Sequence, residues 1–344
     1  MKNKKIKIFL GAYLNYVNAQ NLNCYALAKY LDSKKYDIYA LKINKFKDVK
    51  TKAVLLNCFK PLKITTTISI IYAIIICHII YLPKHKIVHP WLIVFANLLG
   101  RKVFTTIENN MCDIDKESML QSFGGETKLK NHFRFTRNIF GITKFIIKNA
   151  TCGVRLNNYP LYLGVDINMY NFRQRDQLKN IVFIGNLKKR KRVDEFIKLA
   201  TYFKDINFFV IGSGSDLLLL TDKAHQNVHF LGQLSHEEIS QKVEKMDLLF
   251  LPSKSEGFPK VILEVAACGI PSMVYSDYGA NEWMKHMQDG FIIENFDDAI
   301  KNIKKLQVDS ILIQKTSKGA FEMAKRFDWK IIIKEWDQVI RNLK

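Results

Sequence analysis

Residues Leu248–Gly269, LLFLPSKSEGFPKVILEVAACG, constrain the fold more than any other stretch of the chain. They open with the apolar run Leu248–Leu251, which suits a buried strand of a parallel sheet. A polar loop follows, and an apolar helix has Pro259 in its first turn and Gly269 just past its end. A buried strand that leads through a short loop into a helix is the repeating unit of an α/β protein.

Short apolar runs that end in a glycine-bearing turn recur in the second half of the chain. We expect strands there at 181–184, 207–211, 228–231 and 271–275, with turns that contain Gly185, Gly212, Gly232 and Gly279. Open α/β sheets bind ligands at the carboxyl edge, where such turns lie. The first half predicts another parallel sheet, with strands at 6–10, 37–41, 53–56, 86–89, 102–107 and 144–147. With 344 residues, the chain is long enough for two domains of about 150 residues each.

Two glutamates frame the start of the helix in the opening stretch. Glu256 lies in the loop and Glu264 lies eight positions later, about two helical turns further along. Gly257 allows a ligand to approach the backbone, and the free N–H groups available within residues 257–260 form an anion site. Such a site suits a ligand that carries phosphate and hydroxyls, such as a nucleotide sugar. Two glutamates at this spacing are more often solvated surface residues. A carboxylate on a helix as apolar as this one, however, is expected to be buried and then needs a partner.

The net charge of +21 implies polyanionic partners: nucleic acid, an anionic membrane face or phosphorylated substrates. The basic residues are spread over the whole length without an aromatic-interleaved nucleic-acid motif, and a lysine-rich solvated surface accounts for most of them. The six cysteines show no CxxC or Cys/His metal spacing, which favours a reducing cytosol and no structural zinc. The basic start lacks the features of a cleavable signal peptide.

The most apolar segment, Ile64–Leu82, just reaches the length of a membrane span. It contains three threonines, Ser69 and His78, so a core helix with a membrane-facing side is the favoured interpretation. Residues 110–138 are polar, contain Gly124-Gly125, and predict a flexible, acceptor-facing loop.

Common catalytic and nucleotide-binding motifs are missing from the sequence. Gly212-Ser213-Gly214 lacks the third glycine of the dinucleotide fingerprint, and neither a Walker A sequence nor a GxSxG elbow occurs. The basic run 188–192 follows an expected strand, where a lysine can hold a leaving diphosphate. Taken alone, this run is also typical of a solvated surface.

The second half resembles, in register, the nucleotide-sugar domain of retaining glycosyltransferases of family 4. The resemblance runs through Leu163–Asp166, IGNLKKRKRVDEFI, VIGSGS, HFLGQLSHEEI, DLLFLPSKSEGFPKVILEVAACGIP, Gly279–Glu282 and Gly290. That family has the GT-B fold, with two facing Rossmann-like domains built on parallel sheets and a C-terminal crossover helix. The resemblance implies an acceptor domain over 1–170, a nucleotide-sugar domain over 177–325, and a helix over 326–344 that packs back on the first domain.

The resemblance also implies roles for individual residues. Glu256 would hold hydroxyls of the donor sugar, Glu264 would accept the ribose hydroxyls, and Lys191 would meet the diphosphate. The other donor-side residues implied are Gly257, Phe258, Pro259, Lys260, Gly185, Asn186, Arg190, Gly212, Gly214 and Gly11. The family usually has an arginine where this chain has Asn186, so the phosphate charge would fall to Lys191 with Arg190 or Arg192.

The first half matches the family more loosely. Its acceptor-side candidates are His89, Glu108 and Asn109. The family often has a histidine where Glu108 stands, and a double glycine where this chain has Gly11-Ala12.

The function implied is retaining sugar transfer from a nucleoside diphosphate sugar to an acceptor hydroxyl, with no protein nucleophile, metal or cofactor. The basic surface and the apolar segment favour a lipid-linked or cell-surface glycan precursor as acceptor, at the cytoplasmic face of an anionic membrane, with no nucleic-acid partner. Two alternatives remain: a catalytically silent glycan- or nucleotide-binding protein of the same fold, and a basic nucleic-acid-binding protein.

Overall fold

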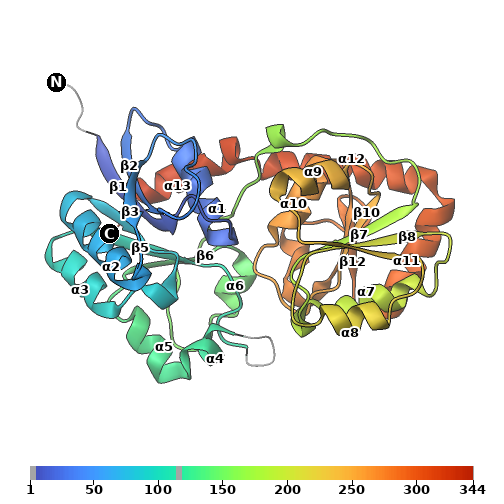
Figure 1. The fold of residues 1–344 in the computed structure, drawn as a ribbon, viewed down its shortest axis with the longest axis horizontal. Helices are drawn as coiled ribbons and strands as arrows, with labels where there is room; N and C mark the ends of the chain where they lie inside the picture. Colours follow the sequence, from blue (N-terminus) through green and yellow to red (C-terminus); the bar gives the residue numbers. More distant parts are fainter. Residues whose placement is uncertain (1–4, 114–117, 344) are drawn as a thin grey trace. The chain divides into compact units, whose positions relative to one another are not determined.

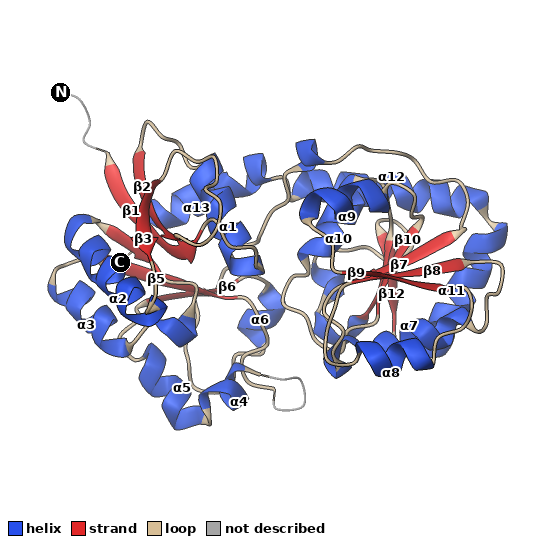
Figure 2. Ribbon diagram, viewed as in Figure 1, coloured by secondary structure: helices blue, strands red, loops and turns tan. Residues whose placement is uncertain are grey.

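The computed structural model describes residues 5–113 and 118–343, and the chain divides into two compact units. Unit 1 comprises Met1–Leu163 and Trp329–Lys344, and unit 2 comprises Gly164–Asp328. Each unit contains one six-stranded sheet with helices on both faces (Figures 1 and 2). The neighbouring strands described in both sheets are paired in parallel.

The sheet of unit 1 has the order β3-β2-β1-β4-β5-β6. Its strands are β1 (Ile6–Tyr13), β2 (Tyr36–Ile43), β3 (Val54–Cys58), β4 (Ile79–Tyr81), β5 (Lys102–Ile107) and β6 (Asn138–Gly141). Its helices are α1 (Ala19–Tyr30), α2 (Leu62–Ile76), η1 (His85–Ile87), α3 (Pro90–Leu98), α4 (Met119–Phe123), α5 (Glu126–Phe133), α6 (Lys144–Lys148) and α13 (Trp329–Arg341). Helices α1 and α13 cover one face, and α2 and α3 cover the other (Figure 1).

The sheet of unit 2 has the order β12-β11-β10-β7-β8-β9. Its strands are β7 (Asn180–Ile184), β8 (Asn207–Ile211), β9 (Val228–Gly232), β10 (Leu248–Leu251), β11 (Ser272–Tyr275) and β12 (Gly290–Ile293). Its helices are η3 (Ile167–Met169), η4 (Lys189–Lys191), α7 (Val193–Ala200), α8 (Leu217–Asp222), α9 (His236–Val243), α10 (Lys260–Ala267), η5 (Ser276–Tyr278), η6 (Ala280–Glu282), α11 (Phe296–Val308) and α12 (Ser310–Arg326). Read from its first strand, this is the doubly wound order of a Rossmann fold, as in unit 1.

The prediction of one helix over residues 64–82 is wrong. Helix α2 ends at Ile76, Cys77 has an extended backbone, and Ile79–Tyr81 form the buried strand β4 between β1 and β5. The expected strand over 86–89 is therefore displaced: residues 85–87 form a 3₁₀ turn and Pro90 opens α3. An apolar run without clear periodicity does not reveal where a helix gives way to a strand.

The prediction of a strand over residues 144–147 is also wrong. Thr143 accepts a hydrogen bond from the Ile146 N–H and caps the short helix α6, and the edge strand is β6 instead. The expected loop over 110–138 contains α4 and α5, and Ser118 with Gln121 forms a capping box at the start of α4. Residues 114–117 of that loop lie outside the described residues.

One disulfide was not predicted from the cysteine spacing. Cys112 and Cys152 are joined, 40 residues apart in the sequence, while Cys24, Cys58, Cys77 and Cys268 are buried free thiols.

Helix α13 belongs to the core of unit 1. The Trp336 ring is fully buried, lies edge-on to Tyr81 with ring centroids 5.7 Å apart, and also contacts Phe104. Its indole N–H donates to the carbonyl of Tyr162 at 2.9 Å. The helix thus buries an apolar face against the strands β4 and β5, which is a main source of helix stability in proteins.

Candidate functional site

The site is built where the strand order of unit 2 reverses, between β7 and β10. The loops that follow these two strands start side by side at the carboxyl edge, because β7 and β10 are parallel neighbours. The two loops are joined by a hydrogen bond from the Lys254 N–H to the Arg190 carbonyl, at 2.9 Å. This edge therefore brings together the basic run and the Glu256 loop, which lie about 65 residues apart in sequence.

Glycines allow the loops after β7 and β8 to approach each other closely. The Gly185 N–H donates to the Ile211 carbonyl, and the Leu187 N–H donates to the Ser213 carbonyl, both at 3.0 Å. A Cβ atom on Gly212 would lie 1.9 Å from the Gly185 oxygen, and one on Gly214 would lie 2.1 Å from the Leu187 oxygen. The Gly-Ser-Gly sequence is therefore needed for loop packing, whatever it contributes to a ligand.

Lys191 and Glu256 form an ion pair at the centre of this edge. The Lys191 ammonium group contacts the Glu256 Oε1 atom, and both side chains are nearly buried, with 13% and 10% exposed. The Arg190 guanidinium lies 3.8 Å from the same oxygen and also donates to the Ser255 carbonyl. Two cations thus converge on one carboxylate, and a multiply charged anion would compete for them.

Arg192 lies at the same edge but is held by unit 2 itself. Its guanidinium contacts Glu195 at 3.7 Å and Asp277 at 3.3 Å, and it stacks on the Tyr275 ring. Arg190 and Arg192 were the two candidates to supply the positive charge that is missing at Asn186. Of these two, only Arg190 lies beside Lys191 and Glu256. Asn186 itself is exposed at the start of this loop.

The segment 256–259 is not helical, which corrects the expected position of Glu264. Pro259 has an extended backbone and caps α10, so Glu264 lies one turn into the helix rather than two turns beyond Glu256. The Gly257 N–H donates no hydrogen bond to the described residues. Phe258 is buried and packs against the Trp283 and Phe327 rings, which fixes the loop.

Glu264 is half-exposed, and its charge acts on two neighbours. Burial, and then the Glu264 carboxylate, raise the pKa of Tyr170. Burial raises the pKa of Cys268 to about 12, and Glu264 contributes to that rise. Tyr170 therefore stands near Glu264 in its protonated form, a neighbour that the sequence did not reveal.

Buried hydroxyl groups near the Glu256 loop are a second feature that the sequence missed. The Ser253 Oγ and Tyr278 Oη atoms have no hydrogen-bond partner among the described residues. Burial and the nearby Glu256 charge raise the pKa of Tyr278 well above its usual value. Ser253 follows β10 and Tyr278 follows β11, so both lie at the same carboxyl edge. Their positions in the sequence could have indicated them as site residues.

Lys260 opens α10 in unit 2, and the other predicted site residues belong to unit 1. A Cβ atom on Gly11 would lie 2.8 Å from the Tyr81 carbonyl, so β1 approaches the end of β4 closely there. Glu108 accepts hydrogen bonds from the Asn23 amide at 3.1 Å and the Thr106 hydroxyl at 3.4 Å. Asn109 is exposed, and His89 lies at the rim of a pocket of about 370 Å³. This pocket is also lined by Lys63, Thr67, His85, Ile87, Val88, Pro90, Trp91, Leu92, Phe123 and His132.

We expect the stability of unit 1 to depend on pH through His85, which lines this pocket. Burial lowers the pKa of His85 to about 4, although its Nε2 atom lies 3.0 Å from the Thr106 carbonyl. The unfolded chain binds this proton near the usual pKa of about 6.5 and the folded chain does not, so acidification favours unfolding. We expect the midpoint temperature of thermal unfolding to decrease when the pH is lowered from 7.5 to 5.0. In the His85→Gln variant the same change of pH should cause a smaller decrease. An equal fall in both proteins would contradict this prediction.

Comparison with known proteins agrees with this geometry. Residues 168–323, nearly the whole of unit 2, match the family model described as glycosyl transferases group 1. That match covers less than half of the chain, and it makes unit 2 similar to the group 1 glycosyltransferases. It is 32% identical over 230 residues to the N,N'-diacetylbacillosaminyl-diphospho-undecaprenol alpha-1,3-N-acetylgalactosaminyltransferase of Campylobacter jejuni, which covers 62% of this chain and 60% of that relative. It is 29% identical to the N-acetyl-alpha-D-glucosaminyl L-malate synthase of Bacillus anthracis, over 39% of each chain. The matches thus span less than two thirds of these relatives.

Solved structures share the fold of this chain over its whole length. Anabaena HepE, in complex with UDP and glucose, superposes with a TM-score of 0.78 at 16% identity, over 99% of this chain and 100% of that one. Sucrose-phosphate synthase of Thermosynechococcus elongatus gives 0.79 at 14% identity, over 99% of each chain. The predicted GT-B fold is confirmed. Among the described residues, no group of His, Cys, Asp or Glu is arranged to hold a metal ion.

Proposed function

We propose that this chain transfers a sugar from a nucleoside diphosphate sugar to an acceptor hydroxyl, with retention of configuration. The observation that carries the proposal is the convergence of Lys191, Arg190 and Glu256 at the strand reversal of unit 2. Support also comes from the family match of the same unit. The complex of HepE with UDP makes UDP-sugars the first donors to test.

In this proposal the residues of unit 2 position the donor and stabilise its leaving group. The donor diphosphate takes the Lys191 and Arg190 charges, together with the Gly257 N–H. Glu256 then accepts hydrogen bonds from the sugar hydroxyls, and Glu264 accepts those from the ribose. Charge builds up on the diphosphate as the bond to the sugar breaks, and fixed cations stabilise that charge more than they stabilise the bound donor. The acceptor hydroxyl attacks from the face that the diphosphate leaves, and a phosphate oxygen takes its proton.

The acceptor in this proposal is a lipid-linked glycan precursor at the cytoplasmic face of a membrane, held by unit 1. Support comes from the C. jejuni relative, whose name includes a diphospho-undecaprenol acceptor. Gly11, His89, Glu108 and Asn109 are the acceptor-side candidates, since they lie at the carboxyl edge of the unit 1 sheet or line the pocket beside it. Among the described residues, no helix has both the length and the apolar character needed to span a bilayer.

Donor binding is tested by a thermal-shift screen of UDP-, GDP- and ADP-sugars, because a ligand that binds the folded state raises its midpoint. We expect one nucleotide series to stabilise the chain. Lys191→Ala is expected to weaken binding of that nucleoside diphosphate by about 10- to 100-fold, the effect of losing a charge-assisted hydrogen bond to phosphate. Glu264→Ala is expected to weaken it by about 10-fold, through loss of the ribose contacts.

Lys204→Ala and Glu237→Ala are matched controls, because both side chains are exposed elsewhere in unit 2. Unchanged nucleotide affinity in both Lys191→Ala and Glu264→Ala would reject the site. Nucleotide binding without transfer to any glycan acceptor would instead identify a silent binding protein of this fold.

A further inference from the structure

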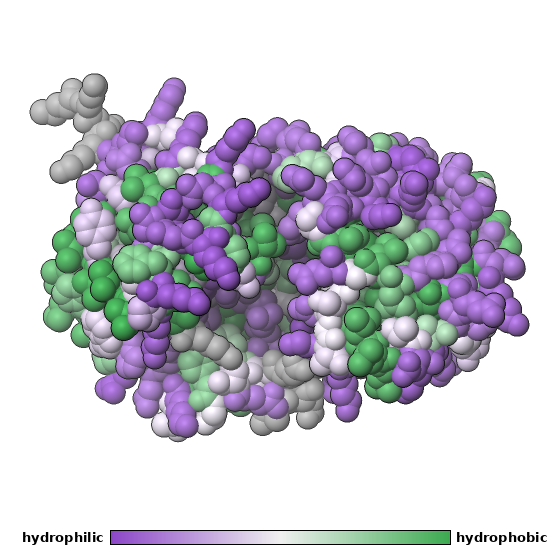
Figure 3. Space-filling view, viewed as in Figure 1, coloured by the Kyte–Doolittle hydropathy of each residue, from purple (hydrophilic) through white to green (hydrophobic). Residues whose placement is uncertain are grey.

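Helices α2 and α3 expose an apolar surface on unit 1. Ile64, Ile68, Tyr72 and Ile75 lie three or four positions apart on α2, and each is at least half exposed. Helix α3 packs beside α2 and adds Trp91, Leu98 and Leu99. Figure 3 shows apolar side chains gathered over these two helices. An apolar patch of this kind on a protein surface marks an interaction site. Helices with such an exposed apolar face can bind at the surface of a membrane.

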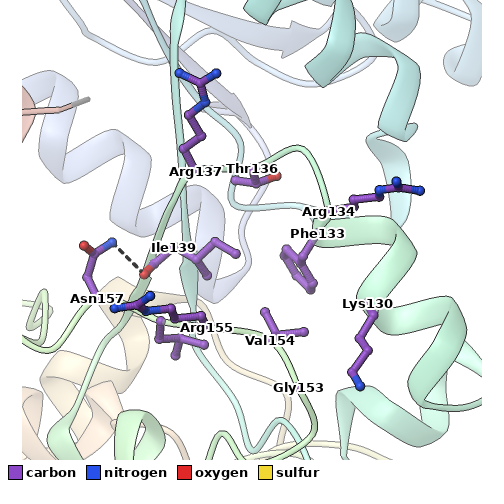
Figure 4. Close-up of a pocket in the computed structure, with 11 residues that line it drawn as sticks. Lys130, Phe133, Arg134, Thr136, Arg137, Ile139, Gly153, Val154, Arg155 and Asn157 are labelled. Atoms are coloured by element: carbon purple, nitrogen blue, oxygen red, sulfur yellow. Dashed lines mark hydrogen bonds between the residues drawn. The ribbon is translucent and has the colours of Figure 1, made fainter.

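A basic pocket of about 310 Å³ opens in the same unit, beside the edge strand β6 (Figure 4). Its apolar floor is formed by Phe133, Ile139, Val154 and Leu156, all buried. Four cationic side chains surround that floor: Lys130, Arg134, Arg137 and Arg155. Thr136, Asn157 and the Gly153 backbone complete the lining. Figure 4 shows the four cationic side chains spread around the pocket, with their charged ends pointing in different directions.

The wall of the pocket is fixed at both ends. Asn157 donates two hydrogen bonds to the Ile139 carbonyl of β6, from its backbone at 2.8 Å and from its side chain at 3.0 Å. At the other end, the disulfide ties Cys152 to Cys112. Between them, Gly153 has a φ of +72° and lies under Lys130, whose Cε atom would be 1.8 Å from any Cβ there. The pocket is therefore built into the fold.

The charges of the pocket are not balanced by the protein. Lys130 pairs with Glu126 one helical turn away, in an exposed pair that contributes little. Arg134, Arg137 and Arg155 have no carboxylate partner among the described residues. Arg134 instead stacks on the Phe135 ring at 5.6 Å. Arginine binds phosphate through its planar fork of donors, so a phosphate group is the anion best suited to this rim.

The pocket adjoins the apolar surface. The Phe135 ring is 40% exposed and sits between Arg134 and Arg137 in the sequence. Its carbonyl accepts a hydrogen bond from the Asn97 side chain of α3, next to the exposed Leu98, at 2.9 Å. Helix α5, which carries Lys130 and leads into Arg134, also packs on α3. Cations and exposed apolar side chains thus meet at one boundary, as in proteins that bind an anionic membrane surface.

We infer that the basic pocket binds the phosphate group of an anionic membrane lipid, whose acyl chains lie against the apolar surface of α2 and α3. The pocket supplies charge and donors for the head group, and α2, α3 and Phe135 supply the contact with hydrocarbon. This inference rests on the proposed function in one respect: a lipid site would hold the chain at the membrane where the proposed lipid-linked acceptor lies. It adds a lipid site that is distinct from the sugar-donor site of unit 2.

The test measures sedimentation of the full chain with vesicles of phosphatidylcholine, with and without phosphatidylglycerol. The test variant is Arg134→Gln/Arg137→Gln/Arg155→Gln, and the control is Lys301→Gln/Lys304→Gln/Lys305→Gln, which removes the same charge from exposed positions on α11. We expect the test variant to bind phosphatidylglycerol vesicles on the order of 100-fold more weakly, because each basic residue at such a surface adds severalfold to binding. We expect the control to change binding by less than about threefold.

Equal losses in the two variants would overturn the inference, because net charge alone would then explain binding. Unchanged binding in the test variant would also overturn it. Calorimetry with inorganic diphosphate separates the two sources of phosphate: arginine-dependent binding of diphosphate without binding of vesicles would reject the lipid. Donor binding is measured on the same samples and should be equal in both variants, so a failure at the lipid site is distinguished from a failure of the proposed function.

Discussion

Glu256→Gln is expected to reduce the rate of sugar transfer by about 100- to 1,000-fold, the usual effect of removing one fixed group that stabilises a transition state. Glutamine keeps the size of the side chain but loses the charge that holds Lys191 and Arg190 in place. It also replaces one acceptor oxygen with a donor, so the sugar hydroxyls lose a hydrogen bond. Initial rates at saturating donor measure the effect.

Nucleotide affinity distinguishes this effect from a general loss of structure. Glu256→Gln should bind the nucleoside diphosphate at least as tightly as the natural chain, because Lys191 no longer pairs with a carboxylate and is free for phosphate. Glu237→Gln, on the exposed face of α9, serves as the control and should transfer at the normal rate. Transfer by Glu256→Gln within threefold of the natural rate would exclude the proposed role of Glu256.

Gly212→Ala is expected to lower the thermal midpoint by about 10 °C and to weaken nucleotide binding at least 10-fold. The new Cβ atom would lie 1.9 Å from the Gly185 oxygen, so the loops after β7 and β8 must separate. Overpacking costs about 1–3 kcal/mol, an unfavourable φ adds about 1–2 kcal/mol, and each kcal/mol corresponds to about 2–4 °C in a domain of this size. The movement would also displace Lys191, which follows the same loop.

Gly232→Ala is the matched control for this change. Gly232 is the last residue of strand β9 in the same sheet and has a φ of +70°, but a Cβ atom there would meet no atom within 4 Å. Its cost is the backbone strain alone, about 1–2 kcal/mol, and nucleotide affinity should stay unchanged. Similar losses in the two variants would show that close packing of the two loops is not what Gly212 provides.

The sequence predicted unit 2 well because most of its strands are short apolar runs with a glycine-bearing turn at their end. β8 and β10 match their expected ranges residue for residue. The errors fall in unit 1, where the apolar run 64–82 holds both a helix and a strand. Periodicity does not separate these two, because α2 is largely apolar and β4 is buried on both faces.

Contacts between distant loops could not be predicted from the sequence. Arg192 is as basic as Lys191, yet Glu195, Asp277 and Tyr275 engage it, and these come together only in the folded sheet edge. Residues 171–179 are rich in charged and polar side chains, yet Arg175 is buried and donates to the carbonyls of Arg173, Glu244 and Met246. A buried guanidinium needs hydrogen-bond acceptors, and here these are mostly carbonyls from distant segments whose positions cannot be read from the local sequence.

The position of α13 has a consequence for the order in which the chain can fold during synthesis. Trp336 completes the packing around Tyr81 and Phe104, but the ribosome makes it only after all of unit 2. Unit 2 is continuous and can fold as soon as it emerges, whereas the nascent unit 1 waits with part of its interior uncovered. A gene fragment that ends at residue 163 should therefore give an aggregation-prone product, and adding residues 329–344 as a separate peptide should rescue its solubility.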